Sequence, residues 1–221
     1  MTTQRWQITC CLLLCLACGI VDAVGFLQHG IFAANMTGNT VLLGISLAQM
    51  QWVHALERAL PLLAFFVGAM LARLLLNRTG KRSWIPLLLE AALIAVALVL
   101  LPDSKLSLAV IAFAMGVQST AVTQFAGVTL STVVITSTMA RIAEAVCDRL
   151  TLPRRQPVAA AVVAGPPLPL YLLTWLCYLA GALVAGLGNV HPLAGMLIAA
   201  VLVLAAAWTT TRTAALSSRA A

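Results

Sequence analysis

Residues 34–40 read ANMTGNT, a run of amide and hydroxyl side chains that interrupts a strongly apolar sequence. A second polar run, STVVITST, occupies residues 131–138 at the equivalent place in the other half of the chain. Each run follows one apolar, helix-like segment and precedes another. Non-helical backbone is tolerated at membrane depth only where protein buries it or where it lines a wet cavity. The two runs therefore favour a transporter or a channel.

The composition is that of a membrane protein. Hydrophobic residues make up 62% of the chain and charged residues 9%, and the mean hydropathy is +1.03. A soluble domain would carry roughly a quarter charged residues. A spanning helix needs about 20 apolar residues, so 221 residues allow about six to eight helices with short connections. The lipid bilayer is thus the expected partner, and the net charge of +7 is an orientation signal that gives no reason to expect nucleic acid.

The first apolar segment also resembles a signal peptide, because Arg5 precedes an apolar run. Apolar sequence continues to Phe26, however, with no polar cleavage region. We therefore expect this segment to stay in the protein as its first helix. The full set of expected apolar segments is 8–28, 31–50, 59–77, 84–101, 106–125, 130–147, 166–187 and 192–209.

The first four segments match the last four. Residues 19–23 align with residues 116–120, which places Asp22 opposite Ser119. A stripe of small residues around Gly68 aligns with one around Gly181. Internal repeats of this kind are common in transporters. The sequence therefore predicts a first membrane repeat at 1–105, a second at 106–210 and a cytoplasmic tail at 211–221.

Basic residues decide the expected topology. They cluster at 78–82 and at 149–155, and eight full crossings would place these clusters on opposite sides, against the positive-inside tendency. If segments 31–50 and 130–147 instead enter and leave on one side, six helices cross and both clusters become cytoplasmic with both termini. The two repeats are then inverted. An alternative also places both basic clusters on one side of the membrane. In it these two segments cross fully, and another segment of each half lies at the interface.

We thus expect an all-α polytopic protein of the bacterial inner membrane, with about six transmembrane helices in two inverted repeats. Each repeat would contain a polar broken or re-entrant segment. These segments and a glutamine on the fifth helix supply the candidate substrate-binding residues Asn35, Thr37, Gly38, Asn39, Gln118, Thr136 and Thr138. The alternative is that the same amides and hydroxyls only form hydrogen bonds between helices.

Two acidic residues lie inside apolar segments. A carboxylate at the centre of a membrane helix costs roughly 3 kcal/mol, and such residues usually face a cavity or a partner. Asp22 and Glu90 are therefore candidates for coupling a proton or cation to transport. Asp22 has a structural alternative, in which backbone or hydroxyl groups bond its carboxyl. Glu90 has one too, an ion pair with a basic residue such as Arg73.

Nothing in the sequence indicates an enzyme, a metal site or a cofactor. The motifs of zinc proteases, serine hydrolases and phosphate-binding loops are missing. The cysteines at 10, 11, 15, 18, 147 and 177 lie in or beside apolar segments. We interpret them as small hydrophobic residues that pack between helices.

Three motifs carry a resemblance to a known family. Gly19-x-x-Asp22-Ala23, Gly30-x-Phe32 and residues 36–39 (MTGN) resemble the YoaK-like family of small bacterial inner-membrane proteins, a domain of unknown function. The likeness extends through Gly116-x-Gln118 over nearly the whole chain. This chain has Ser119 where the family tends to have Asn, and Ser137 where it tends to have Gly. The resemblance implies about six membrane helices and no assigned substrate.

The function we expect is secondary transport of a small polar solute or ion, which would bind between the two polar runs. Asp22 would couple a proton or cation to this movement. Gly68 and Gly181 would allow close helix packing and a homodimer. The alternatives are a passive channel and a non-transporting membrane protein that acts in assembly or sensing.

Overall fold

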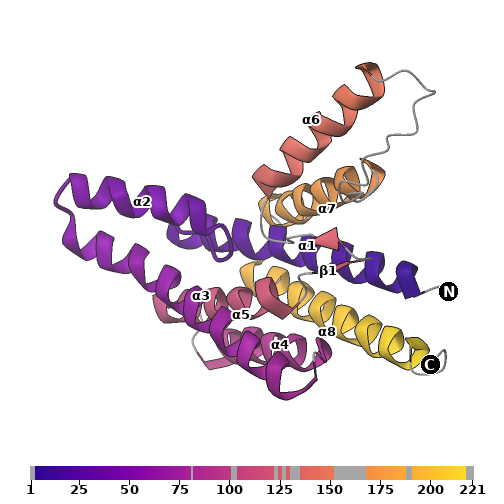
Figure 1. The fold of residues 1–221 in the computed structure, drawn as a ribbon. Coiled ribbons are helices and arrows are strands. Elements are labelled where there is room, and N and C mark those ends of the chain that lie inside the picture. Colours follow the sequence, from indigo (N-terminus) through magenta and orange to yellow (C-terminus); the bar gives the residue numbers. More distant parts are fainter. Residues whose placement is uncertain are drawn as a thin grey trace.

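A computed structural model describes residues 3–80, 82–100, 104–121, 124–125, 128–129, 135–151, 168–187 and 191–217. Within these ranges each predicted apolar segment forms a helix (Figure 1). The helices are α1 (Thr3–His29), α2 (Met36–Ala48), α3 (Trp52–Arg78), α4 (Trp84–Leu100), α5 (Lys105–Ala121), α6 (Ile135–Thr151), α7 (Leu168–Gly186) and α8 (Pro192–Ser217). The expected fold, an all-α polytopic membrane protein, is confirmed.

The helices differ in length and hydrophobicity, and therefore in whether they can cross a membrane. Four of them, α1, α3, α7 and α8, are long and apolar enough to span a bilayer. Three more, α2, α4 and α5, are apolar but shorter. The remaining helix, α6, is amphipathic and exposes the ion pair between Arg141 and Glu144, whose atoms are 3.0 Å apart. This pair matches the spacing of three residues along one helix face.

The connection after α5 differs from the prediction. An apolar segment was expected to continue to residue 125, but α5 ends at Ala121. Two short antiparallel strands follow it, β1 (Gln124–Phe125) and β2 (Val128–Thr129). β1 packs against α1.

Two helices of the bundle, α3 and α5, run in the same direction. Glu57, near the start of α3, forms an ion pair with Lys105, the first residue of α5. Further along both helices, Gly68 packs against the backbone of Phe113. The chain must therefore return along α4, which packs against α5 (Figure 1). The starts of α3 and α5 consequently lie at one end of the bundle.

Glycines allow two very close helix contacts. In the α1–α7 pair, a Cβ atom on Gly19 would lie 2.0 Å from the carbonyl oxygen of Tyr178, and one on Gly181 would lie 2.2 Å from that of Leu16. In the α3–α5 pair, a Cβ atom on Gly68 or Gly116 would lie 2.1 or 2.0 Å from a carbonyl oxygen of the opposite helix. No side chain fits at such distances. Gly68 and Gly181 are therefore occupied by contacts within the chain.

The two pairs occupy corresponding positions in the bundle. α1 packs against α7 and α8, whereas α5 packs against α3 and α4, and α4 packs against α8. α6 packs against α7 alone among the described elements and lies at the edge of the bundle (Figure 1). Most of the buried apolar side chains come from α1, α4, α5 and α8.

The last helix is longer than expected. A tail was predicted from residue 211, but α8 continues to Ser217. The hydroxyls of Thr209, Thr210, Thr211 and Thr213 each donate to the carbonyl three residues earlier, at 2.7–2.8 Å. These polar side chains are therefore satisfied within the helix and do not end it.

Candidate substrate and coupling site

A helix break lies beside the first polar run, but not where it was predicted: residues 36–40 of the run, Gly38 included, are helical in α2, and the non-helical backbone lies just before them, at residues 30–35. α1 ends at His29, and Gly30 adopts a φ of +65°, the left-handed conformation that commonly terminates a helix. Non-helical backbone follows until α2 begins at Met36. Within this connection, Ala33 and Ala34 are completely buried. The chain thus turns back into the protein before it starts α2.

Asp22 holds this connection in place. Its Oδ1 atom accepts hydrogen bonds from the backbone N–H groups of Ala34 at 2.6 Å and Asn35 at 3.0 Å. Its Oδ2 atom accepts one from the hydroxyl of Tyr178 at 2.7 Å. A negative charge beside the first turn of α2 is also favourable because of the helix dipole. The carboxyl therefore joins α1, the break and α7, as the structural alternative expected.

Two asparagines of the run stabilise the backbone around it. The Oδ1 atom of Asn35 accepts a hydrogen bond from the N–H of Gly38 at 3.1 Å, which caps α2. The amide of Asn39, fully buried, bonds both the N–H of Phe32 at 2.9 Å and its carbonyl at 2.7 Å. Thr37, in contrast, is exposed on the first turn of α2. The amides thus support the break, while a hydroxyl remains accessible beside it.

Gly38 fits tightly against this connection. A Cβ atom at this position would lie 2.8 Å from ring carbons of Phe32. That ring in turn stacks on Phe26, with 4.7 Å between the centroids. The glycine therefore lets the start of α2 approach the end of α1.

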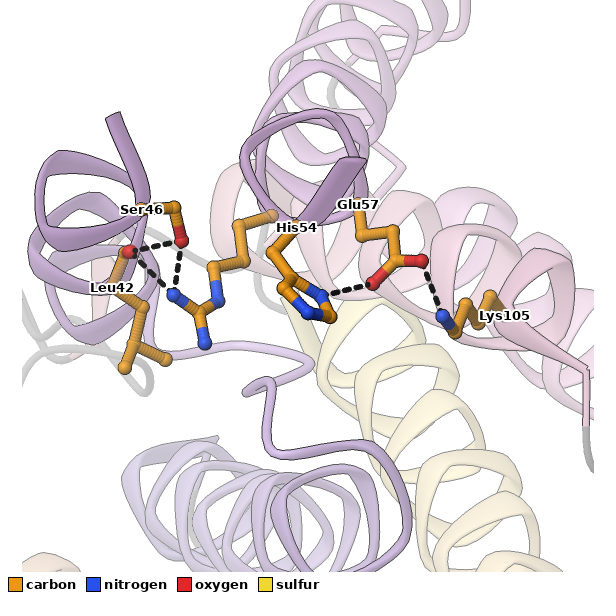
Figure 2. Close-up of polar contacts among 6 residues, drawn as sticks. Leu42, Ser46, His54, Glu57 and Lys105 are labelled. Carbon is orange, nitrogen blue, oxygen red and sulfur yellow. Dashed lines mark hydrogen bonds and ion pairs between the residues drawn. The ribbon is translucent and has the colours of Figure 1, made fainter. Parts of the chain in front are cut away.

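Polar contacts also fix α2 to α3 and α3 to α5. Arg58 of α3 donates to the carbonyl of Leu42 at 2.8 Å and to the hydroxyl of Ser46, both on α2. Figure 2 shows this contact and, beside it, Glu57 between His54 and Lys105. The separation between His54 Nδ1 and Glu57 Oε2 is 3.2 Å. The two contacts of Arg58 hold α2 and α3 together as an antiparallel helical hairpin.

Several of these residues were not predicted from the sequence. Arg58 and Glu57 lie just before the apolar segment that was expected to start at residue 59, so they were assigned to a connection. Tyr178 was overlooked as an aromatic residue in an apolar helix. One sequence signal could have identified Tyr178. It precedes Gly181 by three residues, as Phe65 precedes Gly68 in the aligned segment, which places both aromatic residues beside a close helix contact.

The second polar run is described only in part, since residues 130–134 lie outside the described ranges. Thr136 is exposed and Thr138 is buried, both on the first turn of α6. Gln118 is completely buried on α5. Among the described elements, α2 and α6 make no contact with each other. The structure therefore does not bring Thr136 and Thr138 together with the first run.

Glu90 lies in a different environment from Asp22. It is completely buried on α4, on the same helix face as Leu87, Ile94 and Ala97. Within the described residues, neither of its carboxyl oxygens has a hydrogen-bond partner. The expected alternative, an ion pair with Arg73, is not formed, because Arg73 is exposed on α3 and Glu90 has no partner there. An unpaired charge at such a site would cost several kcal/mol.

The cysteines of α1 are buried thiols. Cys10, Cys11, Cys15 and Cys18 are each at most 1% exposed, and none is in a disulfide. The described residues contain no group of three side chains that could hold a metal ion. Cys10 and Cys18 lie close enough to Glu90 for electrostatic interaction. Packing between helices accounts for the burial of Cys11 and Cys15.

A small cavity lies at the end of the bundle where α5 begins. It has a volume of about 30 Å³ and is lined by Gln28 of α1, Ala97 of α4, Ser107 of α5 and Met196 of α8, among others. The hydroxyl of Ser107 donates to the carbonyl of Ala97 at 3.3 Å. A cavity of this size accommodates a water molecule.

The fold and the helix break define a polytopic membrane protein with a polar connection inside its helix bundle. The family model for proteins of unknown function called DUF1275 matches residues 10–210, and the chain belongs to this family. It is also similar to the UPF0700 transmembrane protein YoaK of Bacillus subtilis (strain 168). The two are 32% identical over 162 residues, which cover 68% of this chain and 72% of that protein. No solved structure matches significantly. The expected resemblance to YoaK-like proteins is thus confirmed.

Proposed function

We propose that the protein is a secondary transporter of a small polar solute or ion in the bacterial inner membrane. The observation that carries this proposal is the buried, non-helical connection between α1 and α2, held by Asp22. Transporters commonly bind their substrates where a membrane helix is interrupted, using the helix ends and the unwound backbone. The exposed hydroxyl of Thr37 would contact the solute, while Asn35, Gly38 and Asn39 hold its surroundings.

Helix lengths support six crossings. α2 has 13 residues and is about 20 Å long, which is shorter than the roughly 30 Å of the hydrocarbon core. α4 and α5 have 17 residues each, at the lower limit for a spanning helix. The crossings would then be α1, α3, α4, α5, α7 and α8. Each half would add one partial element, α2 or α6.

Three crossings in each half would orient the two halves oppositely. The glycine contacts support such a duplication, because Gly19 and Gly181 are used in the α1–α7 pair as Gly116 and Gly68 are in the α3–α5 pair. The parallel direction of α3 and α5 agrees with a single return along α4. In this arrangement both termini and both basic clusters are cytoplasmic. The second half would contribute Gln118, Thr136 and Thr138 to the solute pathway.

The access of water to the two polar runs tests this proposal. Thr37→Cys and Thr136→Cys would each be labelled with a membrane-impermeant thiol reagent from either side of oriented vesicles. Only Cys147 and Cys177 need replacement, because the four cysteines of α1 are almost completely buried. Leu63→Cys, on the exposed apolar surface of α3, is the matched control and should not react.

We expect Thr37→Cys to react from the outside and Thr136→Cys from the inside. That result would establish polar entrances on opposite sides and would justify a screen for transported solutes. Reaction of both positions from the same side would contradict the inverted arrangement. Protection of both would favour a protein without a solute pathway.

One observation favours a second candidate function, a non-transporting assembly or sensor protein. Asp22 and Asn39 are bonded to groups of the same chain, as expected if polar residues only connect helices. Asp22→Asn separates the candidates. A transporter that is coupled through Asp22 should lose solute accumulation, a channel should keep downhill flux, and an assembly protein should lose mainly thermal stability.

A further inference from the structure

We propose that Glu90 binds and releases a proton, and that this carboxyl, in place of Asp22, couples protons to the proposed transport. The role in coupling rests on the proposed function, whereas proton binding does not. The two buried acids differ in their hydrogen bonding. Asp22 accepts three hydrogen bonds, and Glu90 has no bonding partner among the described residues.

Hydrogen bonds to a carboxylate stabilise its charged form. The three donors to Asp22 come from two backbone amides and a tyrosine, so they remain in place only while this charge acceptor is present. Both carboxyl oxygens of Asp22 are thus used to hold the connection before α2 to α1 and α7. A structural role accounts for this acid, whereas no contact of this kind accounts for Glu90.

Glu90 has the opposite surroundings. It lies at the centre of a buried stripe on α4, between Leu87 and Ile94, and is 0% exposed. A carboxyl group sealed among apolar side chains carries a proton, because nothing there compensates its charge. Loss of the proton thus requires water or a moved side chain at this place. Protonation and helix arrangement are therefore coupled at Glu90.

The neighbouring groups do not change this conclusion. From α1, the thiols of Cys10 and Cys18 lie within electrostatic reach, and neither is a cation. On α8, the hydroxyl of Thr209 donates to the carbonyl of Ala206, and Arg212 lies over the ring of Trp208. On α3 and α5, Glu57 and Lys105 pair with each other, and Arg73 is exposed.

A proton fits this site better than a metal cation does. Sodium-like and calcium-like ions require several oxygen ligands, typically six or more for calcium. The thiols of Cys10 and Cys18 lie within electrostatic reach of Glu90, and the described residues contain no group of three metal-binding side chains. A carboxyl without a hydrogen-bond partner among the described residues binds a proton more readily than a metal ion, which needs several ligands.

The cavity near Gln28 indicates where the proton enters. Ala97 lines this cavity and lies seven residues after Glu90 on the same buried face, about 10 Å along the helix. Ile94, completely buried, lies between them. Neither Ile94 nor Glu90 lines the cavity. We therefore expect the proton to reach Glu90 from the end of the bundle where α5 begins.

Infrared spectroscopy of the full-length protein in liposomes tests proton binding directly. The carbonyl stretching band of a protonated carboxyl would be followed from about pH 5 to about pH 9. We expect a band that is lost in Glu90→Gln and that disappears from the wild-type protein as the pH rises. Glu144→Gln, which removes an exposed carboxyl paired with Arg141, should leave this band unchanged.

Two results would overturn the proposal. One is a Glu90→Gln spectrum that equals the wild-type spectrum at every pH. The other is a Glu90 band that persists unchanged across the range, since a permanently neutral acid carries no proton across. A measurement without any variant guards against misfolding. Dicyclohexylcarbodiimide, which reacts with protonated carboxyls in apolar surroundings, should modify Glu90 of the wild-type protein at low pH and at least about tenfold more slowly at high pH.

Transport assays separate this proposal from the proposed function. Proteoliposomes that contain a pH-sensitive dye would be challenged with monovalent ions, amino acids and sugars. If wild-type vesicles respond and Glu90→Gln still accumulates solute against its gradient, the coupling proposal is wrong and transport stands. If the infrared titration succeeds and no solute moves protons or is taken up, the transport proposal fails and the proton site stands.

Discussion

The α1–α7 pair and the α3–α5 pair have the same backbone contact but different polar chemistry. In both pairs two glycines bring one helix against the carbonyl groups of the other. In the first pair Asp22 and Tyr178 bond across the contact at 2.7 Å. At the aligned positions the second pair has Ser119 and Phe65, and Ser119 only bonds the carbonyl of Gly116 on its own helix.

The difference shows that close packing and polar chemistry are separate properties of this protein. Packing is set by the glycines and is present twice. The carboxyl–hydroxyl contact is present once, and it is the one that holds the connection before α2. The described break of the first half therefore rests on a glycine contact that both helix pairs share.

The largest expected effect comes from the shared contact. Gly19→Leu and Gly116→Leu should both abolish folding or reduce it severely, because each side chain would collide with backbone at about 2 Å. The yield of monodisperse protein in detergent and its thermal unfolding measure this effect. Gly44→Leu, which has open space around it, is the control and should be tolerated. If the Gly19→Leu variant folds and the Gly116→Leu variant does not, the glycine contacts of the two helix pairs are not equivalent.

A smaller and unequal effect is expected for the polar residues. Asp22→Ala leaves two buried N–H groups and a tyrosine hydroxyl without their acceptor, so the free energy of unfolding should fall by about 3–5 kcal/mol. Ser119→Ala should change it by less than about 1 kcal/mol, since this hydroxyl bonds only within its helix. Thermal unfolding of both variants in the same detergent gives the comparison. Equal losses would show that the break does not depend on Asp22.

The hydroxyl of Tyr178 should have a smaller effect than the carboxyl of Asp22. Tyr178→Phe removes one hydrogen bond to a carboxyl and should lower the free energy of unfolding by about 1.5–3 kcal/mol. Phe65→Tyr, the reverse change in the other pair, should give no gain. In the double variant with Asp22→Ala, the loss from Tyr178→Phe should largely vanish, because the two residues share one interaction. Additive losses would contradict a direct bond.

Much of the fold was predictable because a membrane imposes a simple rule on sequence. Apolar segments about 20 residues long predicted the helices, and the expected first segment, 8–28, ends one residue before α1 does. The amides and hydroxyls predicted a break near this place but not its position, because from Met36 on they lie within α2, where they cap the helix and bond the connection at 30–35. The end of α8 was not, because Thr209 and its neighbours resemble a polar tail until their bonds to the helix backbone are seen.

The roles of the two acids were less predictable. Sequence places both Asp22 and Glu90 inside apolar segments, but their hydrogen-bond partners come from elements far apart along the chain. Tyr178 lies 156 positions from Asp22, and no local pattern signals that contact. Likewise, only the packed bundle shows that Arg73 is exposed while Glu90 is sealed inside.

The length of α3 has a consequence for the surrounding lipid. With 27 residues it extends about 40 Å, whereas the hydrocarbon core measures about 30 Å and the parallel helix α5, with 17 residues, only about 26 Å. Its first turns, with Trp52, Val53 and Leu56 exposed, reach out of the bundle together with α2 (Figure 1). The apolar part of α3, residues 59–77, is about 28 Å long and fits the hydrocarbon core, so the surplus length is the start of the helix with His54, Glu57 and Arg58. We therefore expect this start, its ion pair with Lys105 and the part of α2 that Arg58 bonds to lie at the level of the lipid headgroups.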